Sequence, residues 1–112
     1  MQNIYPSSVS DKQKILIIAA HPDDEVLGCG ASMAKWCKNG HDINVLILAE
    51  GATSRDEKRD RKSSNKELSL LEQSAQKAGK ILGVLSVELL DYPDNRMDSV
   101  DLLDVVKTIE KR

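Results

Sequence analysis

Two aliphatic runs with a helical pattern between them constrain the fold of this 112-residue chain more than any other feature. The first run occupies residues 14–20 and the second residues 43–49. Short continuous apolar runs are typical of strands that are buried on both faces of a parallel sheet. Two such strands joined through a helix form a right-handed crossover. We therefore expect an α/β, Rossmann-like fold with a mostly parallel sheet flanked by helices.

Three segments carry apolar residues at helical spacing and are expected to form helices. Gly28 and Gly30 in the first segment are expected to let that helix lie close to the sheet. A third strand is predicted over residues 84–90, where the aliphatic pattern recurs. The predicted helices are residues 25–38, 67–83 and 100–112, the last with Leu103, Val106 and Ile109 facing inward.

Two segments are polar and lack core-forming patterns. Residues 1–13 contain a proline and several serines, and are expected to form a flexible lead-in to a domain that spans residues 14–112. Residues 50–66 alternate in charge sign and favour a solvated loop or a frayed helix start.

Charge and composition limit the class of partner. A net charge of −2 and an aromatic content of 3% give little reason to bind nucleic acid or an anionic membrane. The N-terminus lacks the pattern of a signal peptide and no apolar run could span a bilayer, so we expect a cytoplasmic protein. Cys29 and Cys37 would lie about 12 Å apart along one helix and are expected to stay reduced.

Polar residues follow each predicted strand, in the stretches "HPDDE", "EGATSR" and "DYPDNRMD". The carboxyl ends of parallel strands share one sheet edge, which is where open α/β folds bind ligands. In the first stretch, a tight turn can aim a nitrogen of His21 and an oxygen of Asp24 at one zinc ion. Pro22 would stiffen that turn, and Asp23 would accept a proton from the water that the metal activates.

Helix capping is the alternative explanation for these acids. An acid in a first helical turn is stabilising by about 0.3 to 1 kcal/mol and needs no function. Capping accounts for one acid, but it does not account for the His-Pro pair before it. On residue chemistry alone, both interpretations stay open.

The stretch "AAHPDDEVLGCG" resembles the signature of the LmbE-like, or PIG-L, family of zinc-dependent N-acetylglucosaminyl deacetylases. The stretches "EGATSR", "KILGV" and "DYPDNRMDS" are also similar to that family, so the resemblance covers most of the chain from residue 14 onward. It implies a hydrolase that removes an N-acetyl group from an N-acetylglucosamine-type sugar or sugar conjugate. The implied cofactor is zinc, or another divalent metal.

The resemblance also implies roles for individual residues. His21 and Asp24 match two zinc ligands, and Asp23 matches the catalytic general base. Glu25 matches an acid that we interpret as a support orienting the loop.

Three further residues are expected to hold substrate hydroxyls because of their place at the sheet edge. They are Arg55, Asp94 and Arg96. A salt-bridged turn around Pro93 explains Asp94 and Arg96 equally well.

The chain departs from the family in its histidines. A catalytic zinc normally has three protein ligands, and the family's third ligand and its oxyanion-stabilising histidine have no counterpart here. The other histidine, His41, is placed at the opposite sheet edge and is interpreted as a turn residue. We therefore expect the truncated N-terminal half of such a domain, with weaker metal binding and catalysis reduced about 10² to 10³-fold.

Two other functions compete with the enzymatic one. The first is a non-catalytic Rossmann-like module with a vestigial metal site, self-associating through an exposed sheet edge. The second, nucleotide binding, is disfavoured because the chain lacks G-x-G-x-x-G and places acids where a phosphate would lie. A second copy of the chain or a complementing C-terminal half are the expected protein partners.

Overall fold

The structure, a computed structural model, describes residues 11–49, 65–93 and 99–112, without the side chains of residues 65–68. Its elements in chain order are β1 (Lys14–Ala19), α1 (Asp24–Lys38), β2 (Asp42–Ala49), α2 (Asn65–Leu82), β3 (Ser86–Tyr92) and α3 (Leu102–Glu110). None of these ends differs from its predicted place by more than two residues. The expected order of strands and helices is confirmed.

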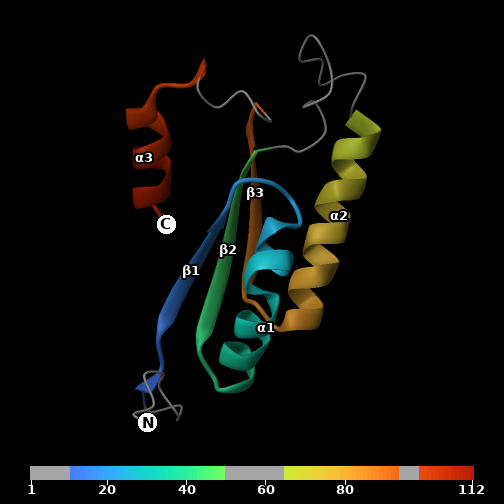
Figure 1. Cartoon of the computed structure of the whole chain (residues 1–112), viewed down its shortest axis with the longest axis vertical. Helices are drawn as coiled ribbons and strands as arrows, with labels where there is room; N and C mark the ends of the chain where they lie inside the picture. Colours follow the sequence, from blue (N-terminus) through green and yellow to red (C-terminus); the bar gives the residue numbers. More distant parts are fainter. Residues whose placement is uncertain (1–10, 50–64, 94–98) are drawn as a thin grey trace.

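The described strands form one parallel sheet in the order β1-β2-β3. Helices α1 and α2 connect successive strands and lie side by side on one side of the sheet, whereas α3 lies on the other side (Figure 1). This is the expected Rossmann-like α/β arrangement.

The core lies between the sheet and the pair α1 and α2. In β2, residues 45–49 are all buried, as expected for a strand with neighbours on both sides and both faces covered. In β1, by contrast, Ile17 and Ala19 are buried while Ile18 is 45% exposed. Burial of β1 on both faces is therefore a wrong prediction, because β1 is an edge strand of the described sheet and only one of its faces is well covered.

Helix α1 packs on the sheet through a face different from the one that its aliphatic residues suggest. Met33 is fully buried, whereas Leu27 is 80% exposed.

The predicted role of Gly28 and Gly30, to let α1 lie close to the sheet, is also wrong. A Cβ on Gly28 would meet nothing within 4 Å, and one on Gly30 would meet only Val26 of the same helix, at 3.6 Å. The close approach of a helix to the sheet occurs instead at Gly79 in α2.

Replacing Gly79 by alanine is expected to lower the free energy of unfolding by about 1 to 3 kcal/mol. The added Cβ would lie 2.5 Å from Cγ2 of Val87 and 2.9 Å from Cγ2 of Val84, and both side chains are stiff because they are β-branched. At an open helical position the same change is stabilising, since alanine is favoured over glycine by about 1 kcal/mol. Urea denaturation measures the difference, with Gln73→Ala, at an exposed position of α2, as the control. A stabilised Gly79→Ala protein would contradict the close contact.

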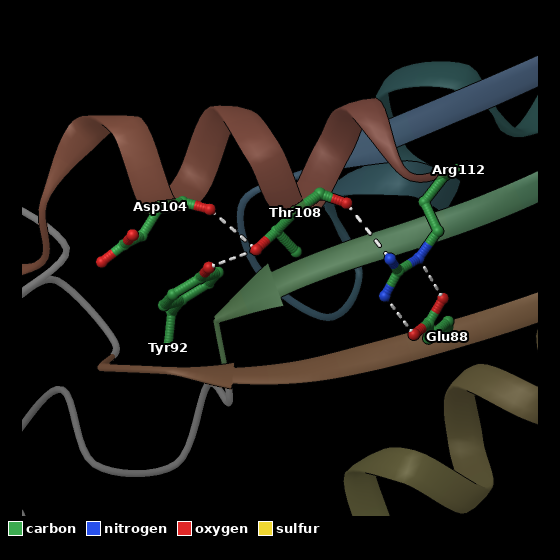
Figure 2. Close-up of polar contacts among 5 residues, drawn as sticks. All are labelled: Glu88, Tyr92, Asp104, Thr108 and Arg112. Atoms are coloured by element: carbon green, nitrogen blue, oxygen red, sulfur yellow. Dashed lines mark hydrogen bonds and ion pairs between the residues drawn. The ribbon is translucent and has the colours of Figure 1, made fainter.

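Helix α3 is held against β3 by polar contacts (Figure 2). The Arg112 guanidinium donates to both carboxylate oxygens of Glu88, at 2.7 and 2.5 Å, and this hydrogen bonding lowers the pKa of the Glu88 carboxyl. The Tyr92 hydroxyl lies 2.8 Å from Oγ1 of Thr108, whose hydroxyl donates to the Asp104 carbonyl, also at 2.8 Å. A forked arginine–carboxylate pair fixes orientation as well as proximity, so α3 is oriented by these bonds.

The predicted inward stripe of α3 is wrong for two of its three residues. Leu103 is 60% exposed and Val106 is also exposed, whereas Ile109 is half-buried. The sheet side of the helix carries Thr108, and Val105 is half-buried as well. Polar contacts to β3 have set the rotation of this short helix.

His41 is buried directly before β2, at the sheet edge opposite the carboxyl ends of the strands, as expected. Its Nδ1 accepts a hydrogen bond of 3.0 Å from the main-chain N–H of Gln13, which precedes β1. The residue therefore ties the starts of two strands together, a role that its interpretation as a turn residue did not include.

Cys29 and Cys37 are both free thiols, as predicted. Burial raises the pKa of the Cys37 thiol, which disfavours the reactive thiolate. Within the residues that the structure describes, no helix is long and apolar enough to cross a membrane.

Candidate active site

The carboxyl ends of the described strands meet at one edge of the sheet. Ala49, which ends β2, pairs with Tyr92 at the end of β3. Its N–H also donates to the carbonyl of Ala20, at 2.8 Å, just after β1. The turn between β1 and α1 therefore starts at the edge where α/β folds bind ligands.

Residues 21–24 form a tight turn between β1 and α1. The N–H of Asp24 donates to the His21 carbonyl at 3.2 Å, closing the turn. Asp23, in the third position, has φ 99° and ψ −28°. A proline in the second position and a positive φ in the third are features of a type II turn, in which the third residue is usually glycine. The turn is thus of a common type with an uncommon residue in it.

The turn brings the side chains of His21 and Asp24 together. Nδ1 of His21 lies 3.3 Å from Oδ2 of Asp24. The same oxygen accepts the main-chain N–H of His21, at 3.1 Å. The Asp24 carboxylate is thus directed back toward His21, and both side chains are partly open to solvent.

Asp23 begins α1 through its main chain only. Its carbonyl accepts the N–H groups of Val26 at 3.0 Å and Leu27 at 2.9 Å. Its carboxylate makes no capping hydrogen bond and the residue is exposed. Side-chain capping therefore does not explain Asp23, although acids in the first turn still interact favourably with the helix dipole.

Glu25, which follows the turn in the first turn of α1, is a buried acid with only 5% of its surface exposed. Its Oε2 accepts the main-chain N–H of Asp23, at 3.0 Å. Burial of a carboxylate is costly unless it is hydrogen-bonded. The contact with Asp23 is therefore a structural feature of the turn rather than a surface contact.

The spacing of the donor pair His21 and Asp24 is that of a direct hydrogen bond, and it is also compatible with two ligands of one divalent metal. Ligands at the usual zinc distances of 2.0 to 2.2 Å, placed at two corners of a tetrahedron, are about 3.4 Å apart. The observed separation of Nδ1 and Oδ2 is 3.3 Å. Among the described residues, however, no group of three or more His, Cys, Asp or Glu side chains comes together. The described part of the chain therefore offers two donors.

An apolar pocket of about 340 Å³ adjoins the turn. Asp23 and Glu25 line it on the α1 side. The α2 side is contributed by Leu71, Ser74, Ala75 and Ala78. Leu71, Ala75 and Ala78 belong to the apolar stripe of the helix predicted over residues 67–83, whereas Ser74 was not expected in it. Periodicity identifies a covered face of a helix without showing where its covering is incomplete.

The three residues predicted to hold substrate hydroxyls lie outside the described residues. They are Arg55, Asp94 and Arg96. Their predicted role stays a prediction, as does the alternative of a salt-bridged turn at Pro93.

Comparison with known proteins identifies the family. The model of the family described as PIG-L, GlcNAc-PI de-N-acetylase, matches residues 16–112. The uncharacterized deacetylase YaiS of Escherichia coli K12 is 33% identical over 104 residues, which cover 93% of this chain and 50% of that protein. The diacetylchitobiose deacetylase of Thermococcus kodakarensis is 33% identical over 89 residues, which cover 79% of this chain and 32% of that protein. The chain thus spans half or less of the length of these relatives.

Solved structures show the same fold. The N,N'-diacetylchitobiose deacetylase of Pyrococcus horikoshii superposes with a TM-score of 0.66 at 24% identity, over 81% of this chain and 33% of that one. GalB, the 4-carboxy-2-hydroxymuconate hydratase of Pseudomonas putida KT2440, superposes with a TM-score of 0.64 at 25% identity, over 76% of this chain and 36% of that one. Since the family model matches nearly all of the described fold, this chain belongs to the PIG-L family.

Proposed function

We propose that this chain carries the metal-binding turn of a hydrolase that removes an N-acetyl group from an N-acetylglucosamine-type sugar or sugar conjugate. The observation that carries the proposal is the separation of 3.3 Å between Nδ1 of His21 and Oδ2 of Asp24, next to an exposed Asp23. The deacetylases among the relatives support the choice of reaction. In the proposed organisation, residues 14–112 are the N-terminal part of a deacetylase-like domain, and the remaining metal ligand lies outside the described residues.

Each residue of the turn has a separate task in this proposal. His21 and Asp24 hold a divalent metal, with zinc as our first choice because its preferred ligands include imidazole and carboxylate. Such a metal polarises a carbonyl and makes water a better nucleophile at neutral pH. The carboxylate of Asp23 takes a proton from the attacking water and returns it to the leaving amine. Glu25 supports the turn. We also propose that the reaction takes place in the cytoplasm.

The turn also distinguishes this proposal from its competitors. Nucleotide binding would need main-chain N–H groups aimed at a phosphate, whereas the N–H groups of His21 and Asp23 already donate to carboxylates of the turn. A non-catalytic metal module would bind the metal without releasing acetate. The likeness to a hydratase shows that this fold hosts more than one reaction, so the substrate has to be tested directly.

The metal site is tested by calorimetric titration of Zn²⁺ into the purified chain. We expect His21→Ala and Asp24→Ala each to weaken binding by about tenfold or more, since even the partners of metal ligands contribute 10- to 100-fold. His41→Gln is the matched control, because it changes the other histidine at the opposite sheet edge and keeps an acceptor for Gln13. Equal zinc affinity in the parent protein and the three variants would contradict the proposed metal site.

The reaction is tested by measuring acetate release from N,N'-diacetylchitobiose and from simple N-acetylglucosamine derivatives. Release that depends on added Zn²⁺ and is lost in His21→Ala supports the deacetylase. A polypeptide carrying the C-terminal half of a relative is then added to complete the site. If the chain binds zinc but releases no acetate with or without this polypeptide, the result supports the non-catalytic module with a vestigial metal site.

A further inference from the structure

The left-handed conformation of Asp23 needs an explanation. Asp23 is the one non-glycine residue with a positive φ among the residues that the structure describes. A side chain in this region costs of order 1 to 3 kcal/mol and persists only where the surroundings impose it. Such strain is often found at active sites, where it directs a functional group.

The main chain of Asp23 is held on both sides. On the carboxyl side, its carbonyl accepts two N–H groups from the first turn of α1. On the amino side, its N–H donates to Oε2 of Glu25, at 3.0 Å. The first set of bonds belongs to any helix start, whereas the second depends on one side chain. Glu25 is therefore the residue whose identity controls the amino-side peptide of Asp23.

Burial of Glu25 strengthens its hydrogen bond to the main-chain N–H of Asp23. Glu25 is 5% exposed, so water does not compete freely for its carboxylate. A hydrogen bond to a charged acceptor is about twice as strong as one between neutral groups. The peptides on both sides of Asp23 fix the direction of its Cα–Cβ bond, and the residue is exposed and lines the pocket between α1 and α2.

We propose that Glu25 is a positioning residue that acts through the main-chain N–H of Asp23: it holds Asp23 in the left-handed conformation and so aims the carboxylate at the substrate. The catalytic consequence rests on the proposed deacetylase function. The conformational consequence does not, because the hydrogen bond can be observed without substrate. Glu25 touches neither the substrate nor the metal in this role.

The test compares side chains that differ in one property. Glu25→Gln keeps the shape and an acceptor oxygen, whereas Glu25→Met keeps the volume and has no acceptor. Glu25→Asp keeps the charge but draws the acceptor back by one methylene, and it serves if the methionine variant does not fold. Glu72→Met, on the exposed face of α2, is the control.

The first readout is hydrogen exchange of the Asp23 amide, followed by NMR. We expect exchange to be faster by about tenfold or more in Glu25→Met and Glu25→Asp, the factor that corresponds to losing a hydrogen bond to a charged group. Glu25→Gln, whose neutral acceptor makes a weaker bond, is expected to retain part of the protection, and Glu72→Met all of it. Unchanged protection of Asp23 in the methionine and aspartate variants would overturn the proposal.

The second readout is acetate release. For Glu25→Met and Glu25→Asp we expect kcat to fall about 10- to 100-fold, with KM and zinc affinity nearly unchanged, because a misdirected base slows the chemical step without removing a binding group. For Glu25→Gln, with its weaker neutral acceptor, we expect a kcat between that of the parent and those of these two variants. Equal kcat in the glutamine and methionine variants would overturn the catalytic part. If the parent chain releases no acetate, the proposed function fails, and the exchange of the Asp23 amide still decides the positioning role.

Discussion

In the proposed deacetylase, replacing Asp23 by asparagine is expected to lower kcat for acetate release by about 10² to 10⁴-fold, the usual contribution of a general base. An amide cannot accept the proton that the carboxylate takes from water. The change leaves His21 and Asp24 untouched, so zinc affinity and KM are expected to stay close to those of the parent protein. Steady-state kinetics and calorimetric zinc titration on the same preparations measure these quantities.

Asparagine is the informative substitute because of the backbone at this position. Asn and Asp are the non-glycine residues that adopt positive φ most readily, so Asp23→Asn preserves the turn at φ 99°. Asp101→Asn is the matched control, since Asp101 is exposed and likewise precedes a helix without a capping hydrogen bond. A kcat in Asp23→Asn equal to that of the control would assign the base to another group.

The order and pairing of the elements could be predicted because they depend on local patterns. Aliphatic runs separated by helical segments leave few topologies once crossover connections must be right-handed. The face that a helix presents was harder to predict. Helix α1 has apolar residues on several sides, so its periodicity did not distinguish the buried Met33 from the exposed Leu27. In α3, contacts with Tyr92 and Glu88 in β3 determine the rotation, and these contacts have no local signature.

The candidate site was predictable as a motif but not as a geometry. Spacing alone suggested that His21 and Asp24 could approach each other, and their side chains lie 3.3 Å apart. The positive φ of Asp23 could not be predicted, since a proline followed by aspartate fits several turn types. The burial of Glu25 could not be predicted either, because an acid in the first turn of a helix is normally exposed to solvent.

Replacing Met33 by alanine is expected to lower the free energy of unfolding by about 2 to 5 kcal/mol. Met33 is fully buried and belongs to the cluster between the sheet and its helices. It is also the one large apolar side chain of α1 that is fully buried, so its truncation leaves a cavity in the core. A domain of this size has about 5 to 15 kcal/mol of stability in total, so the loss is a large fraction.

Urea denaturation with two comparison variants separates a cavity at Met33 from a general effect on α1. Met33→Leu conserves volume and is expected to cost less than about 1.5 kcal/mol, while Leu27→Ala, on the exposed side of the same helix, should change stability by about 0.5 kcal/mol or less. Equal losses in Met33→Ala and Leu27→Ala would contradict the packing of α1. Because α1 begins with Asp24, Met33 also anchors to the core the turn that we propose to bind a metal. Under conditions in which Met33→Ala stays folded, we expect its zinc affinity to equal that of the parent, since the substitution changes how firmly the helix is held and leaves the donor pair intact.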